Sequence, residues 1–318
     1  MTTPKFAFVG LTRWSAALAR GLAGRSDARR VIYADEVEQA RAAHKDGVFT
    51  ASDWNLISAI EGAQAVIVSG PVPRQVELLK ALCPELAPEA SVVALTPVFA
   101  PLLTLALPVG RGLALAHPLL APTAPDEATP DWQTATAEDF GRGAWLLAAA
   151  PGAETALALA ADLARAVGAQ AHFMDPVEHD AASAGAVAAP QVLAAALLAV
   201  ASRPGWTELQ RAADRDFATA TRAADGAQTG DWIANRAALT EALDALTTEI
   251  SRLRAAIQVG DDPTLTNALS AAQQQRAAWL RARAAGEWDP SDHTRAQVPT
   301  LGESLGRMLF GGLGRKKR

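Results

Sequence analysis

The chain has 318 residues, of which 50% are hydrophobic and 20% are charged, so it is long enough for two domains with real cores and is not disordered. Its net charge of −5 gives no general case for a nucleic-acid partner, and we predict none. The single cysteine, Cys83, excludes an intramolecular disulfide and a multi-cysteine metal site, so we predict no metal, a reducing cytoplasm and a small buried thiol.

The first predicted element is an apolar strand that runs into a helix through a glycine turn. Gly10 follows the apolar residues 6–9, and Thr12 and Ser15 stand where a G-x-G-x-x-G loop has its second and third glycines. Those glycines admit the pyrophosphate of a dinucleotide and let the helix pack on the strand. A side chain at Thr12 would stand in the path of the pyrophosphate. The N-terminus of the helix that we expect to start near Leu11 would still favour an anion.

A second apolar strand, 31–34, ends at Asp35. An acid roughly 20 to 25 residues after the first turn lies where a ribose-binding carboxylate belongs. Asp35 would accept hydrogen bonds from the ribose hydroxyls and repel a 2′-phosphate, which favours NAD over NADP. The alternative is that Asp35 only caps the helix beginning at Glu36, and the two interpretations are about equally good.

Short apolar strands alternate with amphipathic helices from Lys5 to about Leu147. This alternation predicts a Rossmann-like parallel sheet covered on both faces. Segment 122–132, rich in proline, threonine and acids, reads as a loop that could border a cleft. The predicted strands are 6–10, 31–34, 65–69, 91–95, 113–116 and 144–148, and the predicted helices are 14–23, 37–44, 54–60, 75–82 and 153–167.

After residue 173 the pattern becomes purely helical. We therefore predict a dinucleotide-binding α/β domain over 1–173, an all-α domain over 174–286 and a C-terminal tail over 287–318. The apolar run 184–201 contains a proline and many alanines, so we predict a buried helix there instead of a membrane span. The predicted helices of this domain are 176–202, 206–224, 231–259 and 263–285.

One of these helices carries a long apolar seam. Its apolar residues recur at spacings of three and four, so the helix must cover something. A partner subunit, giving a homodimer through the helical domain, and packing within the same subunit explain the seam equally well. The seam residues are Leu239, Leu243, Leu246, Ile250, Leu253 and Ile257.

The tail places several apolar residues on a roughly helical face and ends in Arg315-Lys316-Lys317-Arg318. A basic amphipathic end could contact an anionic membrane surface or nucleic acid. A frayed, solvated terminus is the interpretation we favour, so we expect no membrane contact.

Four segments resemble the prephenate and arogenate dehydrogenase family of tyrosine biosynthesis, in order and spacing. The resemblance covers most of the chain, from Phe6 to about Leu280. It is carried by Val66-Ile67-Val68-Ser69-Gly70-Pro71-Val72, by Ala116-His117-Pro118-Leu119, by Met174-Asp175-Pro176-Val177-Glu178-His179-Asp180 and by Phe217-Ala218-Thr219-Ala220-Thr221-Arg222-Ala223-Ala224.

The resemblance implies an NAD-dependent oxidative decarboxylation of prephenate or arogenate. His117 matches the histidine that takes the proton of the substrate's C4 hydroxyl, and Arg222 matches an arginine that holds a substrate carboxylate. Pro71 lies beside the cofactor. The cofactor loop would consist of Gly10, Leu11, Thr12, Arg13 and Ser15, with Asp35 on the ribose and Arg13 able to contact the pyrophosphate.

Two neighbouring residues in the third segment look like an acid and base pair. His179 and Asp180 follow one another on a helix, so their side chains leave it about 100° apart. We therefore predict that they form no site by themselves and serve helix entry and interdomain packing.

Several functional segments of the family are altered. The family's Ser-His-Leu-Pro-His is replaced by 187–191, which keeps only the proline, and its Asp-x-x-Ser-x-Lys is replaced by 94–99. Two hypotheses follow: a working dehydrogenase with a divergent site, or a pseudo-enzyme that acts as a binding or regulatory module. A 6-phosphogluconate or 3-hydroxyacid type of dehydrogenase would need a catalytic lysine in the helical domain, where this chain has none.

Overall fold

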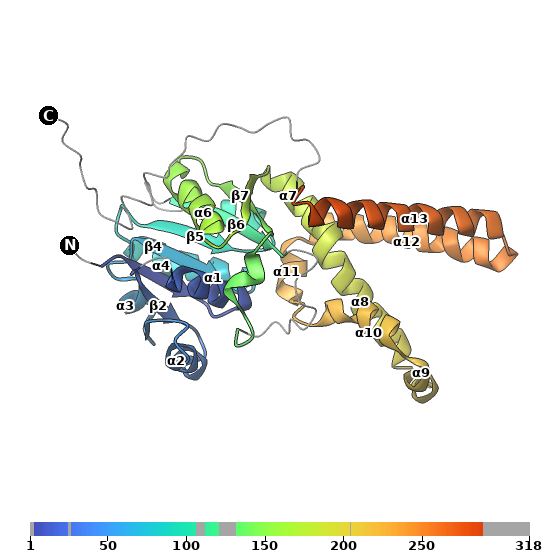
Figure 1. Cartoon of the computed structure of the whole chain (residues 1–318), viewed down its shortest axis with the longest axis horizontal. Helices are drawn as coiled ribbons and strands as arrows, with labels where there is room; N and C mark the ends of the chain where they lie inside the picture. Colours follow the sequence, from blue (N-terminus) through green and yellow to red (C-terminus); the bar gives the residue numbers. More distant parts are fainter. Residues whose placement is uncertain (1–2, 25–26, 106–111, 121–131, 204, 289–318) are drawn as a thin grey trace.

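The computed structural model describes residues 3–24, 27–105, 112–120, 132–203 and 205–288. Within these ranges the chain forms one sheet covered by helices, followed by a purely helical region (Figure 1). The change falls between the end of the last strand at Phe173 and the start of the next helix at Pro176. The predicted tail lies almost wholly outside the described residues.

The sheet has eight strands in the order β3-β2-β1-β4-β5-β6-β7-β8. Strands β1 to β6 pair in parallel, as predicted, whereas β7 pairs with β6 antiparallel and β8 then runs parallel to β7. An antiparallel partner needs no crossover helix, and a 3-10 turn at Ala137–Phe140 lies before β7. The strands are β1 (Lys5–Val9), β2 (Arg29–Tyr33), β3 (Ala51–Ser52), β4 (Ala65–Ser69), β5 (Ser91–Leu95), β6 (Gly112–Leu119), β7 (Ala144–Ala149) and β8 (Gln170–Phe173).

Helices cover both faces of this sheet because its strands are apolar on both sides. One cluster of fully buried side chains lies beneath α1, α2 and α6, and a second lies beneath α3, α4 and α5. Cys83 is buried beside the second cluster, as predicted. The helices are α1 (Arg13–Ala23), α2 (Val37–Lys45), α3 (Leu56–Ile60), α4 (Val72–Leu82), α5 (Ala100–Leu103) and α6 (Glu154–Ala166).

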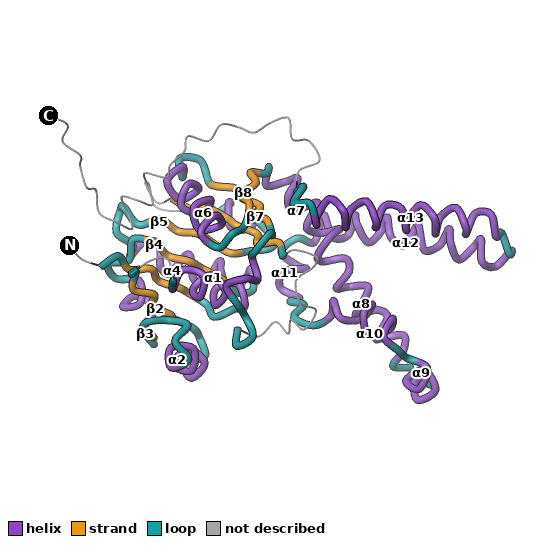
Figure 2. The backbone as a smooth tube through the Cα atoms, in the orientation of Figure 1, coloured by secondary structure: helices purple, strands orange, loops and turns teal. Residues whose placement is uncertain are grey.

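The helical region leaves the sheet at its β8 edge and projects away from it (Figure 2). The first predicted helix is present as α7 and α8, joined by a π-helical turn over Ala184–Ala188, and α12 and α13 form a long antiparallel hairpin. The helices are α7 (Pro176–Ser183), α8 (Ala189–Ala201), α9 (Trp206–Ala212), α10 (Arg215–Thr221), α11 (Thr229–Ala234), α12 (Arg236–Val259) and α13 (Asp262–Ala284).

The prediction of a buried helix over 184–201 is wrong for the single chain. Leu193, Leu197 and Val200 are 38%, 40% and 53% exposed. Among the described residues, the helix Pro176–Ala201 has the length and composition to cross a membrane, with 22% of its apolar window buried. Composition cannot distinguish a helix buried in its own core from one whose apolar face is left open.

The seam of α12 is divided along its length. Leu239 is buried and Leu243 and Leu246 pack beside it, whereas Ile250 and Ile257 are 51% and 66% exposed. The N-terminal half of the seam thus covers the α7–α8 junction, and the other half leaves apolar side chains in solvent.

Candidate functional site

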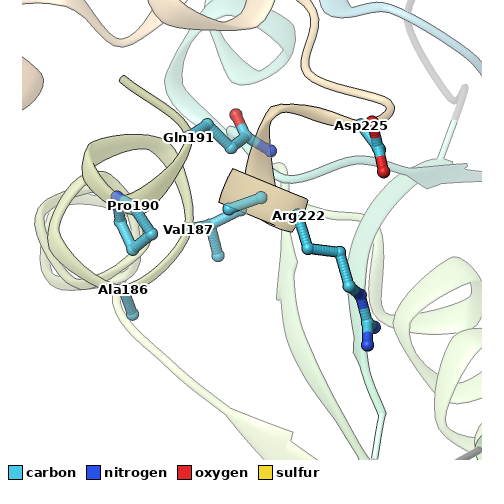
Figure 3. Close-up of a pocket in the computed structure, with 7 residues that line it drawn as sticks. Ala186, Val187, Pro190, Gln191, Arg222 and Asp225 are labelled. Carbon is cyan, nitrogen blue, oxygen red and sulfur yellow. The ribbon is translucent and has the colours of Figure 1, made fainter. Parts of the chain in front are cut away.

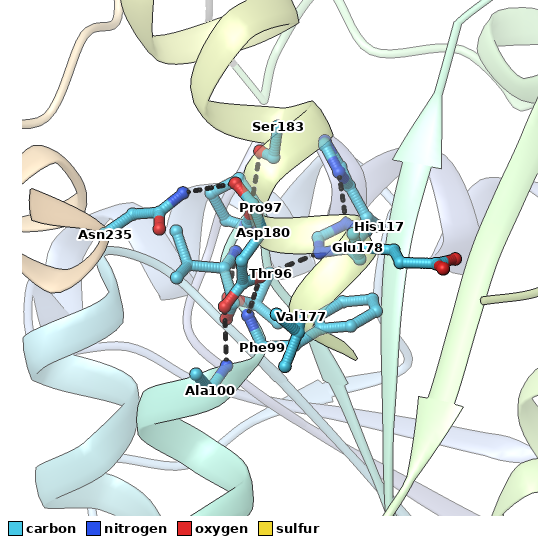
Figure 4. Close-up of polar contacts among 12 residues, drawn as sticks. Thr96, Pro97, Phe99, Ala100, His117, Val177, Glu178, Asp180, Ser183 and Asn235 are labelled. Carbon is cyan, nitrogen blue, oxygen red and sulfur yellow. Dashed lines mark hydrogen bonds and ion pairs between the residues drawn. The ribbon is translucent and has the colours of Figure 1, made fainter. Parts of the chain in front are cut away.

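Three polar side chains from the two regions meet at the carboxyl edge of the sheet. His117 lies inside β6, one residue beyond the residue that pairs with the end of β5, and only 4% of it is exposed. Its Nδ1 lies 3.0 Å from Nε2 of His179, whose Nδ1 lies 2.8 Å from Oδ1 of Asp180 (Figure 4). The result is a buried His117–His179–Asp180 chain in which α7 supplies two members.

His179 and Asp180 do contact one another, and His117 joins them; that they form no site by themselves stays a prediction. Their side chains do leave α7 in different directions, but the Asp180 carboxylate reaches the near side of the His179 ring. The predicted role in packing between the regions is confirmed, since Asp180 accepts hydrogen bonds from the backbone N–H groups of Phe99 at 2.7 Å and Ala100 at 2.8 Å.

The His179 ring is held in a fixed plane. The Phe99 ring stacks on it with centroids 3.5 Å apart and planes 6° from parallel. On the backbone side, Asn235 Nδ2 donates to the Asp180 carbonyl at 2.7 Å, and the Ser183 hydroxyl donates to the Pro97 carbonyl at 2.7 Å. Side chains and turns from β5, α7 and α12 together leave these groups no freedom to reorient.

Burial controls the charge of His117. Loss of solvent, and secondarily the neighbouring His179, lower the pKa of His117 to about 3. On its other side, the Trp14 ring lies with its centroid 5.8 Å from the imidazole. His117 is therefore a neutral imidazole at physiological pH, the form that accepts a proton.

The glycine turn after β1 is closely packed. Gly10 has φ of +101°, and a Cβ atom there would lie 1.9 Å from the carbonyl oxygen of Ser69 at the end of β4. Only glycine fits this position. Leu11 packs its side chain against the core, so a role in cofactor binding would use its backbone.

Helix α1 begins at Arg13, one residue before the predicted range 14–23 and two residues after the start expected near Leu11, and this places Thr12 just before the helix. Thr12 is the N-cap: its hydroxyl accepts from the Ser15 N–H at 3.2 Å, while the Ser15 hydroxyl accepts from the Thr12 N–H at 2.8 Å. Thr12 also donates to Ser69 Oγ at 3.2 Å, and Ser69 donates to the Gly10 carbonyl at 2.9 Å. Two of the four amides that a helix offers to an anion are thus already bonded to side chains.

Arg13 is directed away from the turn. Its Nε lies 2.8 Å from Asp139 Oδ2, and a terminal nitrogen donates to the Thr134 hydroxyl at 3.1 Å. A contact between Arg13 and a pyrophosphate, which stays a prediction, would compete with this ion pair.

Asp35 does not cap the next helix, whose N-cap is Glu36. Both oxygens of Asp35 instead accept from Arg74 on α4, Oδ2 from Nε at 2.8 Å and Oδ1 from a terminal nitrogen at 2.5 Å. Tyr33 also donates to Asp35 at 3.2 Å. The hydrogen bonds from Arg74 above all lower the pKa of Asp35. The acid is therefore ionised, and Arg74 bonds to both of its oxygens.

Pro71 is the N-cap of α4, a helix that starts three residues earlier than predicted because proline is tolerated in a first turn. The backbone N–H of the next residue, Val72, lies in the first turn and has no acceptor within α4. It donates to Asp231 Oδ1 on α11 at 2.7 Å. Gly230 packs so tightly that an added Cβ would lie 2.9 Å from Pro73. The helical region therefore closes the N-terminus of α4, and burial raises the pKa of Asp231.

Arg222 lines a pocket of ≈ 310 Å³ between α8 and the turn that follows α10 (Figure 3). Asp225 and Gln191 contribute further polar side chains to the lining, and Val187 and Pro190 contribute apolar ones. Gln191 is itself held by Trp232, whose Nε1 donates to it at 2.8 Å. The pocket is open to solvent and brings a cation, an anion and an amide beside an apolar wall.

The predicted site residues thus fall into two groups. Gly10, Thr12, Ser15, Asp35 and Pro71 share the carboxyl edge of β1, β2 and β4. His117 lies further along this edge, and Arg222 lies in the helical region. Within the described ranges, no three His, Cys, Asp or Glu side chains are grouped to hold a metal.

Sequence reasoning missed Arg74, Asp231 and the joint role of His179 and Asp180. The Met174–Asp180 segment was noticed but assigned to packing. Asp231 follows a glycine at a predicted helix start, which is a common capping pattern and points to no distant partner.

Solved structures share this fold, although no protein-family model and no curated protein matches the sequence. Arogenate dehydrogenase from Synechocystis has a TM-score of 0.65 at 20% identity, over 86% of this chain and 99% of that one. Prephenate dehydrogenase from A. aeolicus in complex with hydroxyphenyl propionate and NAD+ has a TM-score of 0.74 at 16% identity, over 87% and 99%. A further structure of the Aquifex aeolicus prephenate dehydrogenase has a TM-score of 0.72 at 18% identity, over 87% and 100%.

The fold of this chain, a Rossmann-like sheet followed by helices, is the fold of these two-domain structures. The resemblance to prephenate and arogenate dehydrogenases drawn from the sequence is confirmed at the level of the fold. A shared fold does not by itself carry an activity over to this chain.

Proposed function

We propose that this protein is an NAD(P)-dependent oxidoreductase that oxidatively decarboxylates prephenate or arogenate. The observation that carries the proposal is the buried, neutral His117, fixed at the carboxyl edge of the sheet by His179. In open α/β sheets ligands bind outside this edge. A neutral imidazole there can accept the proton of a substrate hydroxyl.

The other residues take supporting roles in this proposal. Arg222 binds a substrate carboxylate through its planar guanidinium. The backbone of the turn at Gly10 and Leu11 contacts the dinucleotide, and Pro71 lies beside it. The nicotinamide, when bound, accepts the hydride that leaves the substrate ring.

The cofactor edge fits NAD in part. The close approach at Gly10 and the ionised Asp35 are the features of a dinucleotide site, and Asp35 favours NAD because it repels a 2′-phosphate. Glu77, bonded to Arg74 at 2.8 Å, adds a second negative charge on the same side. We therefore propose NAD as the preferred cofactor, with the Thr12 and Ser15 cap restricting the pyrophosphate.

The test is NADH formation with prephenate and with arogenate. We expect turnover with one of them, and Arg222→Gln to raise KM roughly 10- to 100-fold, the worth of a charge-assisted hydrogen bond. His44→Gln, a control substitution on the distant α2, should leave kcat and KM unchanged. If neither prephenate nor arogenate yields NADH under conditions in which a related active enzyme turns over, the proposal is overturned.

The second candidate is a catalytically degenerate binding module. This candidate is favoured because the side chains at the predicted cofactor edge already bond to other residues of the chain. These bonds are the Thr12–Ser15 cap, the Arg13–Asp139 pair and the Asp35–Arg74 pair. Calorimetric titration with NAD separates the candidates. Micromolar binding of both NAD and substrate counts strongly against a degenerate module.

We further propose a cytoplasmic homodimer formed through the helical region. The support is the open apolar face of α8 and of the far half of α12. His179 and Asp180 tie the start of the same helix into the sheet region, which suits a protein interface better than a bilayer. By light scattering, we expect Leu197→Glu to yield monomers, while Trp54→Glu, an exposed position on the sheet region, leaves the dimer intact.

A further inference from the structure

The His117–His179–Asp180 chain has a defined direction of hydrogen bonding. Asp180 accepts from two backbone N–H groups, so its carboxylate also accepts from His179 Nδ1, which must carry a proton. Where the His179 ring carries only this proton, its Nε2 is the acceptor. His117 therefore donates from Nδ1, which leaves its Nε2 as the nitrogen able to take a proton.

The position of His117 raises a problem for a base that works alone. It is buried against Trp14 and His179, so a positive charge on its ring is strongly disfavoured. A base in this position needs a neighbour that removes the charge as the proton arrives. The nearest charged group along the hydrogen-bond chain is the Asp180 carboxylate, which lies beyond His179.

We propose that His179 and Asp180 form a proton relay that makes His117 an effective base. The helical region thus supplies two of the three residues that accept and hold the proton. The inference rests on the proposed dehydrogenase function. His117 is the group that touches the substrate. His179 and Asp180 act through it and are positioning residues.

The relay balances as two proton transfers. The substrate hydroxyl loses its proton to Nε2 of His117, and the Nδ1 proton of His117 moves to Nε2 of His179. His179 is then the imidazolium, with Nδ1 still bonded to the Asp180 carboxylate. The electron pair of the broken O–H bond drives the loss of hydride to the nicotinamide, and carbon dioxide leaves the substrate as proposed above.

The surroundings of His179 suit this role. The parallel Phe99 ring, 3.5 Å away, presents a π face to the ring that becomes a cation. The backbone bonds to Asp180 hold the carboxylate in place in both charge states.

The tautomer of His117 tests the relay without cofactor or substrate. In the full-length protein at neutral pH, ¹⁵N resonances of the imidazoles should report a proton on Nδ1 of His117 and on Nδ1 of His179. A proton on Nε2 of neutral His117 overturns the relay. This ¹⁵N measurement uses the wild-type protein, so it tests the relay even if a substitution prevents folding.

The kinetic arm uses His179→Phe, which keeps a ring to stack on Phe99 and removes the relay nitrogen. We expect kcat to fall roughly 10²- to 10⁴-fold with KM little changed, as when the orienting group behind a catalytic histidine is removed. His44→Gln, which removes a histidine bonded only to a backbone carbonyl, should keep full activity. An active wild type with an equally active His179→Phe variant overturns the relay. An inactive wild type with the expected tautomer overturns the proposed function instead.

Discussion

The sheet region, up to Phe173, and the helical region, from Pro176, bury their apolar residues very differently. The sheet region has two clusters in which most members are almost fully buried. In the helical region one cluster is described, and its buried members are Ala184, Ala189 and Leu239. The sheet region therefore buries most of its apolar side chains within itself, whereas the helical region leaves several of its own in solvent.

The largest expected effect is a truncation in the sheet core. Phe8 is fully buried and packs edge-on against Phe49, with ring centroids 5.2 Å apart. Phe8→Ala should lower the free energy of unfolding by about 3–5 kcal/mol in a denaturant titration. Leu197→Ala on α8 should cost less than about 1 kcal/mol at dilutions where the protein is monomeric. Equal losses of unfolding free energy for the two variants would contradict the comparison between the regions. If Phe8→Ala does not fold, Phe8→Leu takes its place.

The pH dependence of stability probes the junction between the regions. The pKa of His117 is about 3 in the folded chain, against about 6.5 when unfolded, so the unfolded chain binds the extra proton between these values. The contribution of neutral His117 to the free energy of unfolding is complete above pH 6.5. It is lost as the pH falls toward 3, by about 1.4 kcal/mol per pH unit. His117→Phe should flatten this part of the profile in unfolding titrations. An unchanged slope in the variant would assign the pH dependence to other groups.

A smaller effect is expected at the cap that α11 provides for α4. Asp231→Ala removes the acceptor for the Val72 N–H and should cost about 0.5–2 kcal/mol, the usual worth of a helix cap. Asp231→Asn keeps an acceptor oxygen and should recover most of the loss. If hydrogen exchange showed α4 and α11 equally protected in Asp231→Ala and wild type, the cap would not couple the regions.

The smallest effect is expected at the surface pair of Asp35 and Arg74, whose side chains are 53% and 38% exposed. Because this pair lowers the pKa of Asp35, its contribution is present above pH about 3.9 and is lost as the pH falls further. Solvent screening limits it to at most about 0.5 kcal/mol, measured as the difference between wild type and Asp35→Asn at pH 7. A larger difference would make the pair a structural element of the sheet region.

The sheet was predictable because burial on both faces leaves a distinct pattern. The strand from Ala65 to Ser69 is apolar at four of its five positions, and a helix follows each of the strands β1 to β5. Strand β8, whose residues Gln170 and His172 are polar, was not predicted as a strand. The direction of β7 was also missed, because direction depends on the path of the connection and not on residues such as Trp145 in the strand itself.

The candidate site was predictable only in part. Periodicity and resemblance drew attention to His117 and Asp35, but their partners depend on distances that sequence spacing does not encode. Arg74 lies 39 residues from Asp35, and His179 lies 62 residues from His117. For His179 and Asp180, helix geometry predicted the direction of each side chain but not the reach of the carboxylate.

The bonds from Asp180 to the backbone of Phe99 and Ala100 also limit how this chain can be recombined with others. A chimera that joins this sheet to a foreign helical half would inherit His117 without the residues that orient it. It would also leave the buried amide of Phe99 and the partly buried amide of Ala100 without their acceptor. Under the proposed relay, the turn at Phe99 and helix α7 must therefore be exchanged together. A chimera joined at the boundary near residue 174 should lose the contacts of Asp180 with Phe99 and Ala100.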